Sequence, residues 1–220
     1  MTDSFCRLVS GGKAVYKVRR SEFIAAVYPA SSVEAAQRAV EEVKAEQRNA
    51  THNCWAWRTE PIGRRSEASS DDGEPAGTAG RPILGELCRL DLWDAVVIVT
   101  RYFGGVKLGP RGLIEAYSFA ASEAIGHAQK EFFLAGRQVT LVTDYERQTA
   151  LAGLLRRHGL EGPGQEAERE YGETVKIRLF VPLSRVLSVT EATGSYEWNR
   201  LLVEAPAWGG PLWRKAPAEE

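Results

Sequence analysis

Three carboxylates stand close together in a polar, glycine-rich segment, DDGEPAGTAGRP, which spans residues 71–82. Asp71, Asp72 and Glu74 could form a divalent-cation site or an acid–base cluster, because carboxylate oxygens serve both purposes. The same side chains could instead accept hydrogen bonds from backbone N–H groups and cap the helix that follows. The second interpretation is favoured, since the segment has the composition of ordered turns.

A second polar segment, residues 101–112, follows a short apolar run at 95–100 that predicts a buried strand. Its glycines permit close approach to the backbone, and a helix expected from Leu113 offers unpaired N–H groups at its start. Together with three cations these features predict an anion or phosphate site, whose candidate residues are Arg101, Gly104, Gly105, Lys107, Gly109, Arg111 and Gly112. The spacing matches neither standard nucleotide-binding glycine motif. A structural connection, whose cations pair with the acidic segment, is equally open.

His52 and Cys54 form a further candidate, on an expected strand at 51–58 where alternate residues share a face. Side by side they could be a thiolate–imidazole pair or half of a metal site. One strand supplies only two ligands, however, and no spacing in the sequence places a third. A partly buried histidine beside an inert cysteine is therefore favoured, and neither a metal nor another cofactor is predicted.

The composition is that of an ordinary soluble globular protein, with 44% hydrophobic and 26% charged residues. A net charge of −1 gives no overall basic surface, so any nucleic-acid site would be a local patch. No apolar run is long enough to span a membrane, and the first residues lack the core of a signal peptide. We therefore expect a cytoplasmic protein without a membrane partner, and three widely spaced, reduced cysteines.

The elements that must position these residues are predicted from apolar periodicity and helix signals. In the first part of the chain we expect strand structure at 13–28, with a turn of polar residues in its middle, and strands at 51–58 and 95–100. We expect helices at 31–49, 83–90 and 113–128. Ser31 and Glu34 form a capping box for the first helix. Residues 59–82 are expected to be one long loop, mobile around 64–70.

The pattern changes near residue 133. From there the expected elements are a strand at 138–143, a helix at 144–158, strands at 164–171 and 174–181, a helix at 182–193 and a strand at 199–204. This β-α-β-β-α-β order is the split βαβ, ferredoxin-like plan. The sequence thus predicts an α+β protein with domains at 1–132 and 133–205, followed by an irregular, Pro/Gly-rich tail at 206–220.

The two polar segments, read as DDGEPAGTAGRP and VIVTRYFGGVKLGPRGLIEAY, resemble those of the IMPACT/YigZ family, over about residues 13–128. The resemblance implies a bacterial two-domain member. Its N-terminal domain would have the βαβ-type fold of a small-subunit ribosomal protein's second domain and of domain IV of elongation factor G. Its C-terminal domain would resemble domain V of that factor. Arg111 replaces a glycine of many members, and the tail after residue 205 is an addition to the family's pattern.

The resemblance also implies a place in translation, because the family's eukaryotic member regulates an amino-acid-starvation kinase and bacterial members are regarded as nucleic-acid or ribosome binders. The first hypothesis is a non-enzymatic binding protein whose basic, glycine-rich segment touches RNA, the ribosome or a translation-factor protein. The alternative is an enzyme acting on a small anionic or phosphorylated substrate in a pocket between 71–80 and 101–112. A third hypothesis is a protein-only regulator that binds a carboxylate. A basic, convex surface would favour RNA, whereas a pocket holding both segments would favour an enzyme.

Overall fold

The computed structural model describes residues 3–59, 65–162, 167–202, 204 and 206–215 of a mixed α+β protein. Two compact units make up the chain: residues 5–132 form the first, and residues 133–220 with the first four form the second. Each unit has its own apolar core, and the predicted site residues all belong to the first unit. No helix in the described ranges combines the length and the apolar character needed to cross a membrane.

A five-stranded antiparallel sheet forms the frame of the first unit, in the strand order β2-β3-β7-β4-β5. The strands are β2 (Gly12–Val18), β3 (Ser21–Pro29), β4 (His52–Thr59), β5 (Ser66–Ser70) and β7 (Ala95–Tyr102). β7 is central because its apolar run is buried on both faces of the sheet. Apart from this sheet, β1 (Ser4–Ser10) and β6 (Leu92–Trp93) form a short parallel pair.

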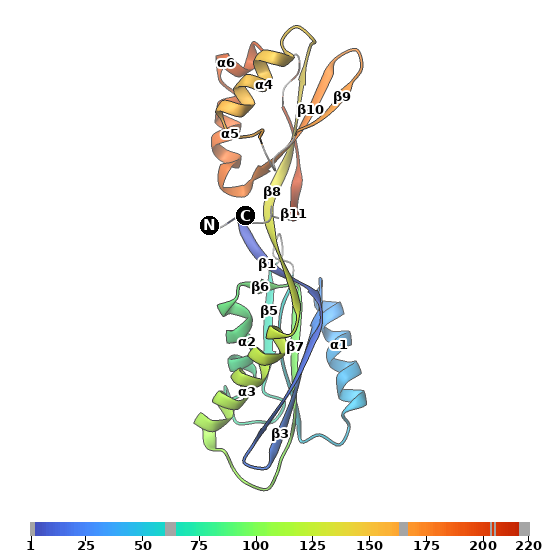
Figure 1. The fold of residues 1–220 in the computed structure, drawn as a ribbon, viewed down its shortest axis with the longest axis vertical. Helices are drawn as coiled ribbons and strands as arrows, with labels where there is room; N and C mark the ends of the chain where they lie inside the picture. Colours follow the sequence, from blue (N-terminus) through green and yellow to red (C-terminus); the bar gives the residue numbers. More distant parts are fainter. Residues whose placement is uncertain (1–2, 60–64, 163–166, 203, 205, 216–220) are drawn as a thin grey trace. The chain divides into compact units, whose positions relative to one another are not determined.

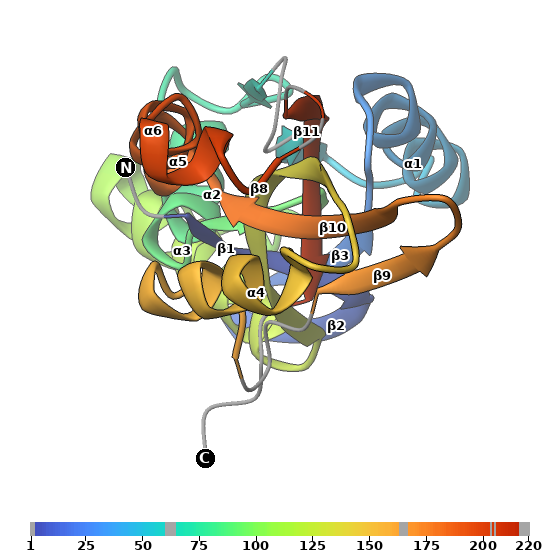
Figure 2. The same cartoon turned by 90° about the horizontal axis from the view of Figure 1, so that it is seen from above.

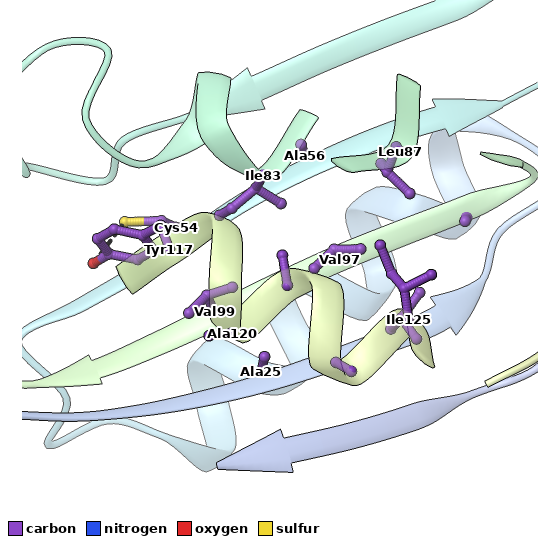
Figure 3. Close-up of a cluster of buried hydrophobic side chains, with 14 of the residues drawn as sticks. Ala25, Cys54, Ala56, Ile83, Leu87, Val97, Val99, Tyr117, Ala120 and Ile125 are labelled. Carbon is purple, nitrogen blue, oxygen red and sulfur yellow. Dashed lines mark hydrogen bonds between the residues drawn. The ribbon is translucent and has the colours of Figure 1, made fainter. Parts of the chain in front are cut away.

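Helices cover both faces of this sheet (Figure 1). On one face, α1 (Val33–Glu46) buries Ala36 and Val40 against side chains of β4 and β7. On the other face lie α2 (Gly80–Arg89) and α3 (Gly109–Gly126), whose small and branched side chains pack on the sheet. Figure 3 shows Ile83 and Leu87 of α2 beside the alanine-lined face of α3.

Three local predictions for this unit are wrong. The N-cap of α1 is Ser32 and not Ser31, because the Ser32 side chain accepts the Ala35 N–H at 3.2 Å. The expected mobile stretch contains β5, an edge strand paired with β4; its polar side chains suit an edge that faces water. α3 begins at Gly109, four residues before the expected start, because Pro110 fits the first turn of the helix.

The second unit has the chain order β-α-β-β-α-β and the strand order β11-β8-β10-β9, with all neighbours antiparallel. Its elements are β8 (Gln129–Thr143), α4 (Gln148–Arg157), β9 (Glu168–Tyr171), β10 (Val175–Pro182), the 3-10 turn Leu183–Arg185, α5 (Val186–Thr193), α6 (Tyr196–Asn199) and β11 (Ala207–Lys215). The helices pack on one sheet face, where alternate residues of β10 are buried (Figures 1 and 2). The expected split βαβ plan is thus present.

The last strand of this plan lies elsewhere than predicted. Trp198, Leu201 and Leu202 have helical spacing, and the described part of 199–204 is a helix end and a turn whose apolar side chains join the core. The strand that completes the sheet is β11, which pairs with β8 from within the predicted irregular tail. The expectation of an irregular tail is therefore wrong for residues 207–215.

Candidate functional site

A buried carboxylate, Glu74, is the centre of the polar network in the first unit. Its Oε1 accepts hydrogen bonds from Arg101 Nη1 at 2.6 Å and from the Tyr117 hydroxyl at 2.8 Å, and His52 Nε2 lies 3.9 Å away. Four segments bring these groups together: the turn after β5, the end of β7, the middle of α3 and the start of β4. The sheet register places His52 directly opposite Arg101.

The other two carboxylates of the acidic segment hold the backbone in place. Asp71 accepts the backbone N–H groups of Gly77, Ala79 and Gly80 at 2.8–2.9 Å, which caps the start of α2. Burial raises the pKa of Asp71, but these three donors outweigh it and leave the pKa below its ordinary value. Asp72 accepts the backbone N–H of Asn53 at 2.7 Å and pairs with Lys44. The backbone N–H partners of Asp71 and Asp72 are those expected for loop carboxylates that stabilise the local structure.

His52 and Cys54 bond to two different carbonyl groups of the same turn. His52 Nδ1 lies 2.8 Å from the Asp72 carbonyl oxygen, and the Cys54 thiol donates to the Asp71 carbonyl oxygen at 2.9 Å. Cys54 also lies beside the Tyr117 hydroxyl, with 3.4 Å between sulfur and oxygen (Figure 3). Burial raises the pKa of Cys54 to about 12 and also raises the pKa of Tyr117. At neutral pH neither group supplies an anionic nucleophile.

A pocket of about 370 Å³ opens between the acidic and the glycine-rich segments. Its lining residues are Thr51, His52, Glu74, Pro75, Arg101, Phe103, Lys107, Leu108, Gly109, Pro110 and Leu113. The pocket therefore joins the segments that the sequence analysis proposed as two sides of one site. Arg101 and Glu74 lie in its wall, side by side with apolar groups.

The three cations of the glycine-rich segment do not converge on this pocket. Arg101 is buried and paired with Glu74, whereas Lys107 is exposed in the lining and has no ion-pair partner among the described residues. Arg111 pairs with Glu115 at 2.9 Å and lines a different hollow, together with Tyr16 and Arg19. The fold therefore does not bring the three positive charges together at one point.

The glycines of this segment have structural causes. A side chain at Gly104 would place its Cβ 1.9 Å from the Arg20 carbonyl oxygen. Gly105 and Gly109 have φ values of +84° and +75°, which other residues adopt at a cost. Gly112 lies inside α3, where an added Cβ would be 3.1 Å from the Leu108 side chain. Backbone geometry at Gly104, Gly105 and Gly109, and side-chain packing at Gly112, thus account for these glycines without a ligand.

Several residues of the site were not predicted from the sequence. Tyr117 lies on the alanine-lined face of α3, and a tyrosine on such a face is a signal that a hydroxyl enters the core. Ser21 was not considered; its Oγ lies 3.3 Å from both Arg101 Nη2 and the Gly104 N–H. In the described ranges no three His, Cys, Asp or Glu side chains are grouped closely enough to hold a metal ion.

Comparison with known proteins identifies relatives for most of the chain. The model of the "Impact N-terminal domain" family matches residues 19–125. The chain is 33% identical to "IMPACT family member YigZ" of Escherichia coli over 173 residues, covering 78% of this chain and 83% of that protein. It is 40% identical over 162 residues to "IMPACT family member in pol 5'region" of Thermus thermophilus, covering 74% of this chain and 86% of that protein. A crystal structure of a hypothetical protein is 26% identical and covers all of both chains, with a TM-score of 0.59.

Proposed function

This chain belongs to the IMPACT family, and from that premise we propose that it is a non-enzymatic binding protein of the translation apparatus. Membership of the family supports translation as the setting, because regulation of translation is the role that the resemblance implies for its eukaryotic member. A likeness to domains IV and V of elongation factor G would fit this setting and stays a prediction. The contact site of the proposal is the pocket side of the glycine-rich segment.

One observation carries the choice of binding over catalysis: the pocket exists, yet its carboxylate and the buried thiol near it are engaged inside the protein. Glu74 accepts from both Arg101 and Tyr117, and Cys54 donates to a backbone carbonyl. The raised pKa of Cys54 keeps the thiol protonated at neutral pH. Lys107 is available at the rim. Such a site offers recognition groups and no activated nucleophile.

A protein component is favoured over RNA as the partner. Binding to a phosphate backbone relies on several cations facing the strand, whereas Arg101 is neutralised by Glu74 and Arg111 faces elsewhere. Among the described residues of the lining, Lys107 alone supplies an uncompensated charge to the pocket. The lining is otherwise rich in apolar side chains, including Phe103 and Leu108, as protein-binding sites commonly are.

An enzyme acting on a small anion is the second candidate. The pocket joins both predicted segments, and His52 lines it with Nε2 3.9 Å from Glu74 Oε1. A histidine next to a carboxylate is a common acid–base arrangement. If His52→Gln retains partner association but abolishes turnover of a phosphorylated or carboxylated metabolite, the enzyme is the better description.

The test is co-sedimentation with ribosomes from lysate, followed by identification of the retained partners with and without nuclease. We expect Lys107→Ala to lose most of the association and Arg111→Ala, a matched exposed cation outside the pocket, to keep it. Both side chains are exposed, so neither change should alter the fold. Equal association of Lys107→Ala and the parent chain at every salt concentration overturns the proposal. Nuclease-sensitive association assigns the partner as RNA instead of protein.

A further inference from the structure

We propose that the outer edge of β2 binds an extended peptide segment, in which acidic and apolar side chains alternate, as an added strand of the sheet. This surface is separate from the pocket beside Lys107, and the inference goes beyond the proposed function. β2 is the last strand of its sheet: β3 pairs with one of its edges, and no described strand pairs with the other (Figure 1). A further strand can be added to a free edge of this kind.

The register of the hairpin shows which backbone groups of β2 are unused. Val18 precedes a two-residue turn, and the pairs of an antiparallel ladder alternate between hydrogen-bonded and non-bonded. Lys13, Val15 and Lys17 therefore turn their N–H and C=O groups away from β3. The Lys13 carbonyl oxygen agrees with this direction, because it lies 2.9 Å from Nδ1 of His127, beyond the edge. The backbone groups of Val15 and Lys17 have no partner among the described residues, so two donors and two acceptors are free there.

The side chains along this edge make it positively charged. Residues 12–29 carry four cations and one carboxylate, in a chain whose net charge is −1. Lys13 and Lys17 are exposed on one face, on either side of Val15. Glu22 offsets Lys17 only through an exposed pair of 3.2 Å. An acidic strand complements this edge, whereas a second copy does not, because antiparallel pairing about Val15 would place lysine opposite lysine.

The turn that ends β2 adds two cations in a strained conformation. Arg19 and Arg20 have φ values of +45° and +65°, in the left-handed region that a type I′ hairpin turn requires at both positions. Asn-Gly is the preferred pair there, because glycine adopts a positive φ at little cost. Lysines on an edge also discourage pairing between copies, but that purpose does not require arginines in a strained turn. The strain points to a use for the two charges.

An apolar hollow lies on the other face of the same edge. Tyr16 contacts Phe119 of α3, with 4.6 Å between the ring centroids, and Phe119 is 47% exposed. Next to them is a hollow of about 360 Å³, whose lining residues are Tyr16, Val18, Arg19, Leu108, Arg111, Gly112, Glu115 and Ala116. Arg111 and Glu115 pair with each other there. Tyr16 and Val18 point away from the face of the lysines, so an added strand would meet an apolar surface on one side and cations on the other.

These observations favour a peptide strand over RNA. RNA phosphates would pair with the cations, but they would not match the alternating N–H and C=O groups of Val15 and Lys17. An extended peptide satisfies those groups. Because its alternate side chains point to opposite faces, it also meets the lysines and the hollow at the same time.

The experiment uses the full chain and the fluorescently labelled hexapeptide Val-Glu-Val-Glu-Val-Glu. By fluorescence anisotropy we expect Lys13→Glu combined with Lys17→Glu to weaken binding by about tenfold or more, because like charges then face each other. Arg38→Glu combined with Arg48→Glu is the matched control. It reverses two exposed cations on and just after α1, which packs on β4 and β7, and should leave binding unchanged.

N-methylated peptides test the backbone pairing. Methylation of all the valine N–H groups, or of all the glutamate N–H groups, removes one of two alternating sets, and only one set faces β2. We expect one methylated peptide to bind like the parent peptide and the other to bind about tenfold or more weakly. Val15→Pro deletes an outward N–H without removing a bond to β3, so it should weaken binding of the parent peptide while the chain stays folded.

Equal effects of the two methylations, binding that survives the lysine reversal, or no binding at all overturns the added strand. Tighter binding of a single-stranded RNA hexamer, lost on the same lysine reversal, assigns the surface to RNA and overturns it as well. Should Val15→Pro unfold the chain, the methylated peptides still decide. Lys107→Ala should bind the peptide like the parent chain, so the proposed function is tested separately by its ribosome association.

Discussion

Glu74 and Arg101 form an ion pair inside the first unit, with 2.6 Å between Oε1 and Nη1 and side chains only 3% and 6% exposed. Arg101 comes from the central strand β7 and Glu74 from the turn that precedes α2. The pair therefore ties the acidic segment to the glycine-rich segment. Because each charge has left water, each depends on the other for compensation.

The first prediction concerns this dependence. Arg101→Met or Glu74→Gln removes one charge and leaves the other buried, which should lower the free energy of unfolding by about 3–5 kcal/mol. Urea denaturation measures this loss of stability. Glu115→Gln is the matched control, because it breaks the exposed pair with Arg111 and should cost about 0–1 kcal/mol. Equal, small losses of stability in all three variants would show that the buried ion pair stabilises the fold no more than the exposed pair does.

The second prediction concerns Asp71 and pH. Its carboxylate caps α2, so Asp71→Ala should cost about 1–2 kcal/mol at pH 7. The pKa of Asp71 is lowered in the folded chain, so the stabilisation is present above the unfolded pKa of about 3.9 and is lost as the pH falls through the folded pKa. Unfolding curves from pH 7 to pH 2 should therefore show parent and variant converging. A difference that is constant over this range would contradict the assignment.

The third prediction concerns the cysteines. Cys88 is exposed whereas Cys6 and Cys54 are buried, and burial raises the pKa of Cys54 to about 12. At mildly alkaline pH a thiol reagent such as Ellman's should therefore modify Cys88 rapidly and the other two only after denaturation. Cys88→Ser should remove the fast phase. If a fast phase persists in that variant and disappears when Cys54→Ser is added, Cys54 is reactive and the catalytic alternative gains weight.

Much of the fold could be predicted because the buried face of a strand or helix gives its sequence a regular spacing of apolar residues. The run in β7 and the alternation in β10 both marked strands correctly. β5 and β11 could not be found in this way, because an edge strand of serines and a Pro/Gly-rich strand carry little apolar signal. β5 and β11 are strands because they pair with β4 and β8, and the local sequence does not show this pairing.

The site was predictable in its parts but not in its arrangement. The acidic and glycine-rich segments are both recognisable in the sequence, and a pocket between them is what the enzyme hypothesis predicts. Lys107 and Arg111 line different hollows because the turn at the start of α3 directs their side chains apart. Tyr117 joins the network through helix packing, a long-range contact that spacing alone does not encode.

The last prediction concerns Gly104, which is explained by close packing and not by ligand approach. An added Cβ would lie 1.9 Å from the carbonyl oxygen and 2.1 Å from the carbonyl carbon of Arg20, and backbone atoms cannot rotate away. Gly104→Ala must therefore displace the β2–β3 turn or the start of the glycine-rich segment, and we expect a loss of about 1–3 kcal/mol by urea denaturation.

Gly85→Ala is the matched control for this change. Gly85 lies within α2 and an added Cβ would meet nothing within 4 Å, so alanine there should stabilise the chain by about 0.4–1 kcal/mol. The two substitutions add the same methyl group, so opposite signs isolate the effect of its surroundings. If Gly104→Ala were as stable as the parent while losing partner association, the glycine would serve binding, and the packing explanation would be wrong.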